Sequence, residues 1–142
     1  MARVLDGDTI IVAGTKIRLH GIDAPEMDQI FQRNGRFLAC GEMSYAALEA
    51  LIAGERVRCE GVEWDPYGRL VAKCYLQNGV DINRRMVSSG WALAYRHFSS
   101  DYVDAENAAR QDRRGMWRGS FIKPWTHRAE QGRRGGQKFP AR

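Results

Sequence analysis

Residues 3–26 read RVLDGDTIIVAGTKIRLHGIDAPE, and in this stretch short β-rich runs alternate with turn signals. The pairs Asp6-Gly7 and Ala13-Gly14 separate apolar runs, as is typical where neighbouring strands are joined by tight turns. Pro25 ends the third run, because proline cannot donate a hydrogen bond to a strand ladder. The pattern predicts three consecutive strands, over residues 3–5, 9–12 and 16–22.

The rest of the chain adds helices to further short strands. Apolar spacing and following glycines predict helices over 43–53, 81–89 and 101–114. Strands are predicted over 57–62, 70–76 and 91–95, whereas residues 27–41 lack periodicity and are expected to form a long loop. An α+β fold follows, and a five-stranded OB-fold β-barrel with about three packed helices fits it, as one candidate among several.

Length and composition indicate one globular domain. The chain has 142 residues, of which 44% are apolar and 27% charged. No apolar run approaches the roughly 18 residues of a membrane span, so we expect no membrane partner. We also expect the chain to be a monomer. Residues 128–142 are rich in Gly, Arg and Gln and are predicted to be a flexible basic tail behind a domain of residues 1–127.

Charge is distributed unevenly along the chain. The net charge is +5, and 18 of the 22 basic residues are arginine. Residues 1–28 nevertheless carry a net charge of −2, and residues 110–142 one of +8. Clustered carboxylates without matching bases favour a hard cation, and an arginine-rich remainder favours a polyanionic partner. The alternative is that the early acids lie in loops and are only hydrated.

Three short motifs carry candidate chemistry. They are Asp6-Gly7-Asp8-Thr9, the run RLHGIDAPE over residues 18–26, and Asp65-Pro66-Tyr67-Gly68-Arg69. Taken singly, each also has a simple structural interpretation: a hairpin turn, a hydrated loop, or a surface arginine beside a turn.

Together, the three motifs resemble the staphylococcal nuclease (thermonuclease) family. The resemblance covers about residues 2–127, and the motifs occur in the family's order. It implies a calcium-dependent enzyme that hydrolyses phosphodiester bonds of DNA and RNA and leaves 3′-phosphates. Because an unpaired strand needs no unstacking, we expect single strands to be favoured.

The resemblance also assigns residue roles. Two carboxylates and one backbone carbonyl would bind Ca²⁺, two arginines would hold the scissile phosphate, and one glutamate would orient or deprotonate the attacking water. These are, in that order, Asp8 and Asp23, the carbonyl of Ala24, Arg18 and Arg69, and Glu26. Asp6 would lie behind the first ligand. A dication and two arginines suit the negative charge that grows as water attacks phosphorus.

Two tyrosines are candidates to flank the bound nucleotide. Tyr67 and Tyr95 match by resemblance, and aromatic rings stack on bases. Buried packing is the alternative for Tyr95. Pro66 departs from relatives that carry lysine there, which removes a possible phosphate contact.

Two other functional classes remain. Some nuclease-like domains have lost their active sites and act as non-catalytic nucleic-acid-binding OB-fold modules, and a protein-interaction domain could bind metal for stability alone. A degenerate module would lack several of the five catalytic or ligand side chains. All five are present here, which favours the enzyme: Asp8, Arg18, Asp23, Glu26 and Arg69.

The cysteines suggest a compartment. In a symmetric hairpin around Pro66 and Tyr67, Cys59 faces Cys74, Val57 faces Leu76, and Glu60 faces Lys73 as a charged pair. We therefore expect a Cys59–Cys74 disulfide if the protein is exported, with Cys40 free; two reduced core thiols are the alternative. No leader precedes the first strand, so the protein is expected to be secreted or periplasmic if a leader has been removed, and cytoplasmic otherwise.

Overall fold

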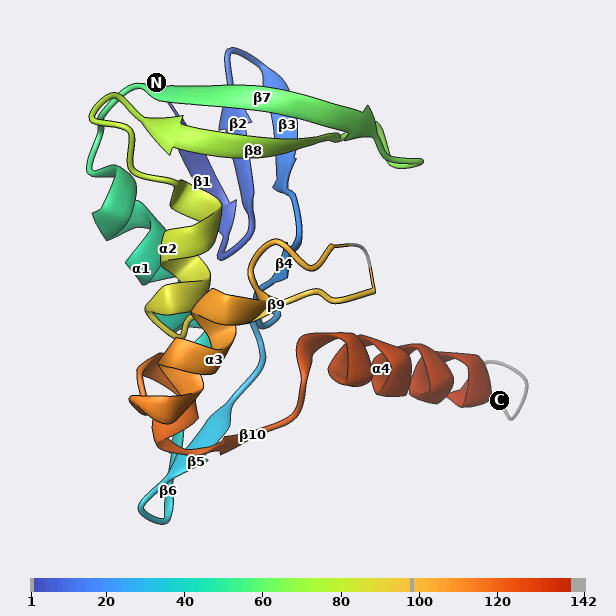
Figure 1. Cartoon of the computed structure of the whole chain (residues 1–142). Coiled ribbons are helices and arrows are strands. Elements are labelled where there is room, and N and C mark those ends of the chain that lie inside the picture. Colours follow the sequence, from blue (N-terminus) through green and yellow to red (C-terminus); the bar gives the residue numbers. More distant parts are fainter. Residues whose placement is uncertain (1, 98, 139–142) are drawn as a thin grey trace.

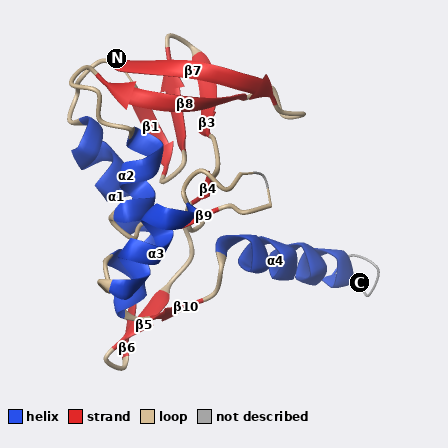
Figure 2. Ribbon diagram, in the orientation of Figure 1, coloured by secondary structure: helices blue, strands red, loops and turns tan. Residues whose placement is uncertain are grey.

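The computed structural model describes residues 2–97 and 99–138, with side chains up to residue 132. A five-stranded sheet lies at one end of the molecule, α1–α3 lie beside and below it, and α4 projects to the side (Figures 1 and 2). In chain order the elements are β1 (Arg3–Asp6), β2 (Thr9–Val12), β3 (Thr15–Leu19), β4 (Ile22–Asp23), β5 (Phe31–Arg33), β6 (Arg36–Leu38), α1 (Cys40–Ile52), β7 (Val57–Trp64), β8 (Leu70–Leu76), α2 (Ile82–Ser88), β9 (Leu93–Ala94), α3 (Val103–Gln111), the 3₁₀ turn η1 (Gly115–Arg118), β10 (Ser120–Phe121) and α4 (Pro124–Lys138).

The large sheet has the strand order β1-β2-β3-β8-β7. β3 and β8 are parallel, and the other neighbours are antiparallel. The five-stranded sheet and the α+β class were predicted, but the closed barrel was not found. Within the part of the chain that the structure describes, no ladder joins the edge strands β1 and β7. β1 is only four residues long, and α1 packs against it.

The predicted strand over 16–22 is split in two, and the break positions the site. β3 ends at Leu19, and Gly21 then turns the chain with a φ of 76°. The turn also lies close to Tyr102, because a Cβ at Gly21 would be only 2.8 Å from the ring. After the turn, β4 pairs with β9 in a separate two-stranded sheet, in which the buried Asp23 lies opposite Leu93.

The expected loop over 27–41 is wrong. β5 and β6 form a hairpin in this stretch, and β10 extends it to three strands. The turn is Asn34-Gly35, with φ angles of 52° and 76°, and this dipeptide is a strong hairpin signal. The strands are only three residues long, so alternation along them is too short to detect as a period.

Helices α1–α3 correspond to the three predicted helices, with different bounds. α1 begins three residues earlier than predicted, and α2 begins after Asp81, whose carboxylate accepts a hydrogen bond from the Arg84 backbone N–H at 2.9 Å. α4 was not predicted. It runs through the boundary placed at residue 127, where a flexible tail was expected; proline at the first helical position suits a helix start. Residues 139–142 of that tail lie outside the described residues.

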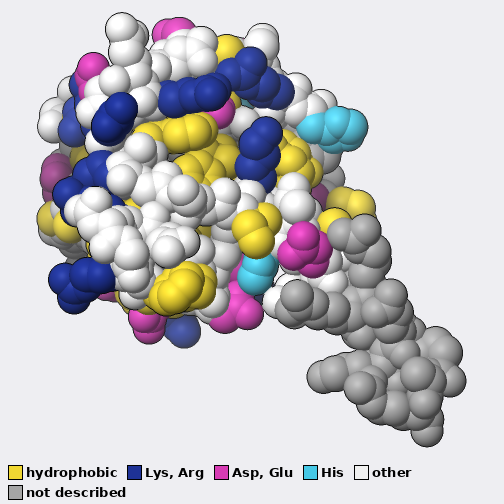
Figure 3. All heavy atoms as spheres, turned by 90° about the horizontal axis from the view of Figure 1, so that it is seen from below, with side chains coloured by type: hydrophobic (Ala, Val, Ile, Leu, Met, Phe, Trp, Pro, Cys, Tyr) yellow, Lys and Arg dark blue, Asp and Glu magenta, His cyan; other side chains and the backbone are white. Residues whose placement is uncertain are grey.

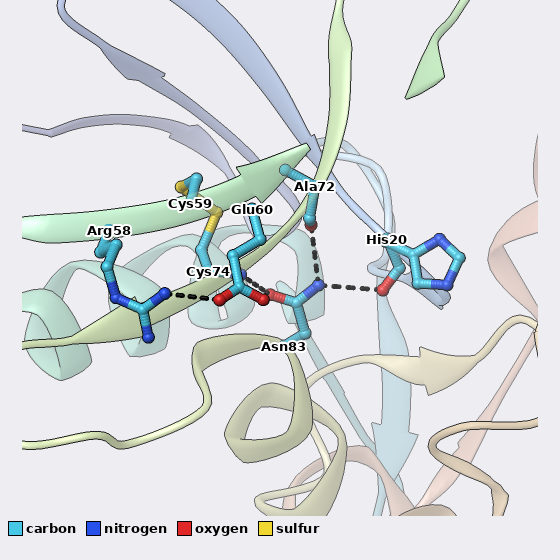
Figure 4. Close-up of a disulfide and its surroundings, with 7 residues drawn as sticks. All are labelled: His20, Arg58, Cys59, Glu60, Ala72, Cys74 and Asn83. Atoms are coloured by element: carbon cyan, nitrogen blue, oxygen red, sulfur yellow. Dashed lines mark hydrogen bonds and ion pairs between the residues drawn. A yellow bond between two sulfur atoms is a disulfide. The ribbon is translucent and has the colours of Figure 1, made fainter. Parts of the chain in front are cut away.

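Two apolar clusters form the core. The larger fills the space between the sheet and the helices, and the smaller surrounds Phe31, Cys40, Leu93 and Met116. The fully buried Asn83 side chain links three segments within the larger cluster. Its Nδ2 donates to the carbonyls of His20 and Ala72, and its Oδ1 accepts from the Cys74 N–H (Figure 4).

The β7–β8 hairpin has the predicted register from Val57 to Gly61, but a register shift between Gly61 and Glu63 moves the pairs nearer the turn by one residue. Cys59 lies opposite Cys74, and the structure joins their sulfur atoms in a disulfide (Figure 4). Glu60 lies opposite Lys73 as expected, but the two do not form the predicted charged pair. Glu60 instead accepts a hydrogen bond at 2.6 Å from Arg58, two residues earlier on the same strand. Lys73 Nζ lies 3.0 Å from a carboxylate oxygen of Asp101, so each side chain pairs with a different partner.

Candidate active site

The turn between β1 and β2 places the first carboxylates. Asp6 accepts a hydrogen bond from the Asp8 backbone N–H at 3.0 Å, which tightens the turn. Gly7 between them packs so closely against α1 that a Cβ would lie 1.9 Å from the Ser44 hydroxyl oxygen. Glycine at this position therefore allows the acidic turn to dock on the helix.

Asp8 is buried with both of its oxygens engaged. Oδ2 accepts from the Ala24 backbone N–H at 2.7 Å, and Oδ1 accepts from the Thr9 hydroxyl at 3.2 Å. The first contact joins the turn after β1 to the segment after β4. Residues sixteen positions apart in sequence are thus fixed at one point.

Arg18 on β3 lies between the two carboxylates that were predicted to bind the metal. Its Nη2 lies 3.4 Å from Asp8 Oδ2 and 3.4 Å from Asp23 Oδ1. Its Nη1 donates to the carbonyl of Leu19 at 2.9 Å, which holds the side chain along its own strand. The two buried carboxylates therefore share one guanidinium.

Glu26 is positioned by close packing of the chain after Pro25. Its backbone N–H donates to the Gln29 side-chain oxygen at 3.2 Å. Its carbonyl oxygen lies against the start of α1, where a Cβ on Gly41 would approach it to 1.9 Å. The Glu26 side chain is 37% exposed, so it can reach a substrate or water.

Arg128 is a site residue that the sequence did not reveal. From α4, its Nη1 lies 2.9 Å from both Asp23 Oδ1 and Glu26 Oε1, and its Nη2 lies 2.6 Å from Asp23 Oδ2. It follows Asp23 by 105 residues, so no local motif connects the two. The only signal was the basic charge of the C-terminal segment, which does not single out one arginine.

Arg69 lies at the other wall of the site and is held by its own turn. Its Nε donates to Asp65 Oδ2 at 2.6 Å, and the other oxygen of Asp65 accepts from the backbone N–H groups of Tyr67 and Arg69. Although desolvation acts to raise it, these hydrogen bonds keep the pKa of Asp65 below its usual range. Tyr67 is 83% exposed, and the Arg69 guanidinium carbon lies 5.7 Å from its ring centre.

Tyr95 contacts another aromatic ring. Its ring stacks on Trp125 of α4, with 5.2 Å between centroids and an angle of 4°. Buried packing was the alternative to nucleotide contact for this residue, and the stack shows that one face packs against α4. Tyr95 still lines the same cavity as the carboxylates.

All but one of the predicted ligand, catalytic and nucleotide-contact residues line a single cavity of about 540 Å³. Ala24, predicted to act through its backbone carbonyl, lies beside it through its contact with Asp8. The side chains that line it include Asp6, Asp8, Arg18, Asp23, Glu26, Tyr67, Arg69, Tyr95 and Arg128. The three motifs therefore meet in space.

Burial perturbs the three aspartates differently. Desolvation and the charge of Asp8 raise the pKa of Asp6 to about 7. Desolvation opposes ionisation of Asp8 too, but Arg18 and the hydrogen bonds that Asp8 accepts keep its pKa below the usual range. Desolvation raises the pKa of Asp23 despite the hydrogen bond from Arg128. Negative charge in this site therefore depends on nearby cations.

The donor set fits a hard cation, although protein side chains alone do not complete a site. Among the residues that the structure describes, no three Asp, Glu, His or Cys side chains are grouped to hold a metal ion. Asp8 and Asp23 are buried carboxylates that already share positive charge from Arg18. Calcium takes six to eight oxygens, including backbone carbonyls and waters, so Asp8, Asp23 and the Ala24 carbonyl suit it.

Comparison with known proteins agrees with this geometry. The sequence profile described as "Staphylococcal nuclease homologue" matches residues 16–119. The chain belongs to the staphylococcal nuclease family. The matched range includes Arg18, Asp23, Glu26 and Arg69, whereas Asp8 and Arg128 lie outside it.

Individual relatives carry varied names. The chain is 38% identical over 120 residues to "Succinoglycan biosynthesis protein ExoI" of Rhizobium meliloti (strain 1021), which covers 82% of the chain and 63% of that protein. It is 36% identical over 137 residues to an "Uncharacterized endonuclease" of Escherichia coli O157:H7, covering 90% of the chain and 84% of the relative. It is 32% identical over 145 residues to "Micrococcal nuclease" of Shigella flexneri, covering 90% and 78%.

No helix in the described part of the chain is both long and apolar enough to cross a membrane.

Proposed function

We propose that this chain is a calcium-dependent nuclease that hydrolyses phosphodiester bonds of DNA and RNA, favours single strands and leaves 3′-phosphates. One observation supports the proposal above the others: Asp8, Arg18, Asp23, Glu26 and Arg69, drawn from three separate motifs, line one cavity. Two of these are buried carboxylates that need a cation, and two are arginines suited to phosphate.

The residues divide the work by their positions. Asp8 and Asp23, with the Ala24 carbonyl, would hold the calcium ion, and Asp6 would fix the turn that presents Asp8. When bound, calcium supplies a Lewis acid that neutralises phosphate charge and lowers the pKa of a water.

The remaining groups act on substrate and water. Arg18 and Arg69 lie on the cavity wall and would bind the phosphate oxygens, where their positive charge stabilises the transition state. Asp65 orients Arg69 by holding its Nε. Glu26 is exposed enough to accept a proton from the attacking water and to hold that water in line.

The surface suits a single-stranded polyanion. The exposed Tyr67 ring at the rim of the cavity can stack on an unpaired base. On the face seen in Figure 3, Lys and Arg side chains lie around a patch of apolar side chains. The basic side chains contribute to the net charge of +5, which favours a polyanionic partner.

We also propose that the protein works in an oxidising compartment. The Cys59–Cys74 disulfide supports an oxidising environment, such as the periplasm or the extracellular medium, because glutathione keeps most cytosolic thiols reduced.

Product analysis tests the reaction and separates it from simple binding. We expect a 5′-labelled single-stranded oligonucleotide to be cut to fragments that end in 3′-phosphate, as phosphatase treatment and mass spectrometry would show. Glu26→Gln should bind the same oligonucleotide but not cut it, whereas Glu60→Gln, which changes an exposed acid on β7 outside the cavity lining, should cut normally. Binding of the oligonucleotide by wild-type protein without any cleavage would instead support the non-catalytic module.

A further inference from the structure

Arg128 occupies the carboxylates that the proposed mechanism assigns to calcium and to water. Its two terminal nitrogens contact both oxygens of Asp23 and one oxygen of Glu26, at 2.6–2.9 Å. Such short charge-assisted contacts from a planar fork are the strong class of hydrogen bond. The Asp23 side chain is completely buried, and its negative charge is balanced by Arg128 and, at a longer distance, by Arg18.

Arg128 reaches the site because the beginning of α4 is docked on the body. The Trp125 ring stacks on Tyr95, and the His127 Nε2 lies 3.3 Å from Asp28 Oδ1. Just before the helix, the carbonyl of Ile122 accepts a hydrogen bond from the Gln29 side chain. These contacts attach the first turns of the helix to the body and bring Arg128 into the cavity lining, and the rest of α4 projects away from the body (Figure 1).

The two sides of the Arg128–Asp23 contact differ in exposure. The Arg128 side chain is 38% exposed, so its guanidinium can reach water once its contacts with the carboxylates are broken. Asp23 is 0% exposed and cannot gain water in the same way. A buried carboxylate that loses its partner must be given another cation or a proton. Release of Arg128 therefore favours replacement by a second cation.

Arg18 does not play the same part. It also contacts Asp23, but at 3.4 Å, and its other terminal nitrogen is held by the carbonyl of Leu19 on its own strand. Arg18 thus belongs to the sheet, whereas Arg128 comes from α4, a separate helix at the other end of the chain.

We propose that Arg128 is an internal counter-ion that competes with calcium for Asp23 and Glu26, and that α4 is a strap that holds it there. This inference rests on the proposed function. Guanidinium and calcium both bind carboxylate oxygens, so one oxygen pair cannot serve both fully. The strap also covers one face of Tyr95, so that docking of α4 and stacking of a base on that face exclude each other.

When Arg128 competes in this way, the apparent dissociation constant for calcium equals the intrinsic constant divided by the fraction of molecules in which the site is free. If the strap is docked in roughly 90–99% of molecules, its removal tightens calcium binding about 10- to 100-fold. The other residues that line the cavity stay unchanged.

Calorimetric titration with calcium alone tests the inference. Arg128→Gln removes the guanidinium but keeps a polar side chain, and we expect it to bind calcium at least about tenfold more tightly than wild type. Arg58→Gln removes the same charge from an exposed ion pair on β7, outside the cavity lining, and should bind like wild type. Equal or weaker binding by Arg128→Gln would overturn the inference.

Two further measurements separate competition for calcium from a substrate-binding role of Arg128. Turnover of Arg128→Gln at saturating calcium should equal or exceed that of wild type; a loss of turnover with unchanged calcium affinity would make Arg128 a substrate-holding residue and would overturn the inference. If neither protein binds calcium, the proposed metal requirement fails and the inference fails with it. If Arg128→Gln does not fold, Trp125→Leu releases the strap from Tyr95 without touching the carboxylates, and the same tightening is expected.

Discussion

Reduction of the Cys59–Cys74 bond perturbs the protein without removing any side-chain volume. The bond closes a loop with a sequence separation of 15 residues. A loop of this size is expected to stabilise the folded state by about 3 kcal/mol, through the entropy it removes from the unfolded chain. For a domain of this length each kcal/mol corresponds to roughly 2–5 °C, so reduction should lower the melting temperature by about 6–15 °C.

The assay compares thermal unfolding with and without a strong reductant. Circular dichroism follows the transition, and mass spectrometry after alkylation without reductant counts the free thiols. We expect one free thiol, from the buried Cys40, and a lower melting temperature after reduction. A Cys59→Ala/Cys74→Ala double variant is the control, because its melting temperature should not respond to reductant. Three alkylatable thiols in the native protein, or a melting temperature that reductant leaves unchanged, would refute the reasoning.

The remaining predictions concern the site and its supports. Glu26→Ala and Arg69→Ala should each lower turnover by about 10²–10³-fold, and both variants should still fold because the two side chains line an open cavity. Wild-type turnover in either variant would remove that residue from the mechanism. Gly41→Ala should destabilise the fold by about 1–3 kcal/mol and also lower turnover, because its Cβ would collide with the Glu26 carbonyl; unchanged melting and activity would contradict the close approach. Asp65→Asn should lower the free energy of unfolding at neutral pH, because a carboxyl with a lowered pKa stabilises the folded state only while it is ionised. The difference from wild type should disappear as the pH falls below 3.8. A difference that persists in acid would contradict this origin.

Local signals were sufficient for most of the large sheet. β2 and β8 have their predicted bounds because apolar runs of four to seven residues end there at turn residues. The pairing of Val57 to Gly61 with β8 agrees with the symmetric hairpin that the turn signal predicted, whereas the register shift between Gly61 and Glu63 had no signal in the sequence. The acid-rich turn after β1 and the run ending at Glu26 indicated the site because the residues of each motif are close in sequence.

Long-range packing decided what the sequence did not reveal. Whether β1 closes onto β7 depends on the lengths of both edges and on where α1 packs, which no local pattern encodes. The β5–β6 hairpin is too short for periodicity, although Asn34-Gly35 was a usable signal. Arg128 joins the site only because α4 returns to residues more than 100 positions earlier.

Cleavage in the presence and absence of calcium tests the proposed nuclease directly. Purified wild-type protein would be incubated with a fluorescently quenched single-stranded DNA oligonucleotide, first with a calcium chelator and then with calcium in excess of it. Asp23→Asn serves as the matched variant, since it keeps the size of the side chain and removes the charge of a buried ligand. We predict no cleavage with chelator, rapid cleavage after calcium is restored, and little cleavage by Asp23→Asn in either condition. Equal cleavage by wild-type protein with and without the chelator would contradict a calcium-dependent mechanism built on Asp8 and Asp23.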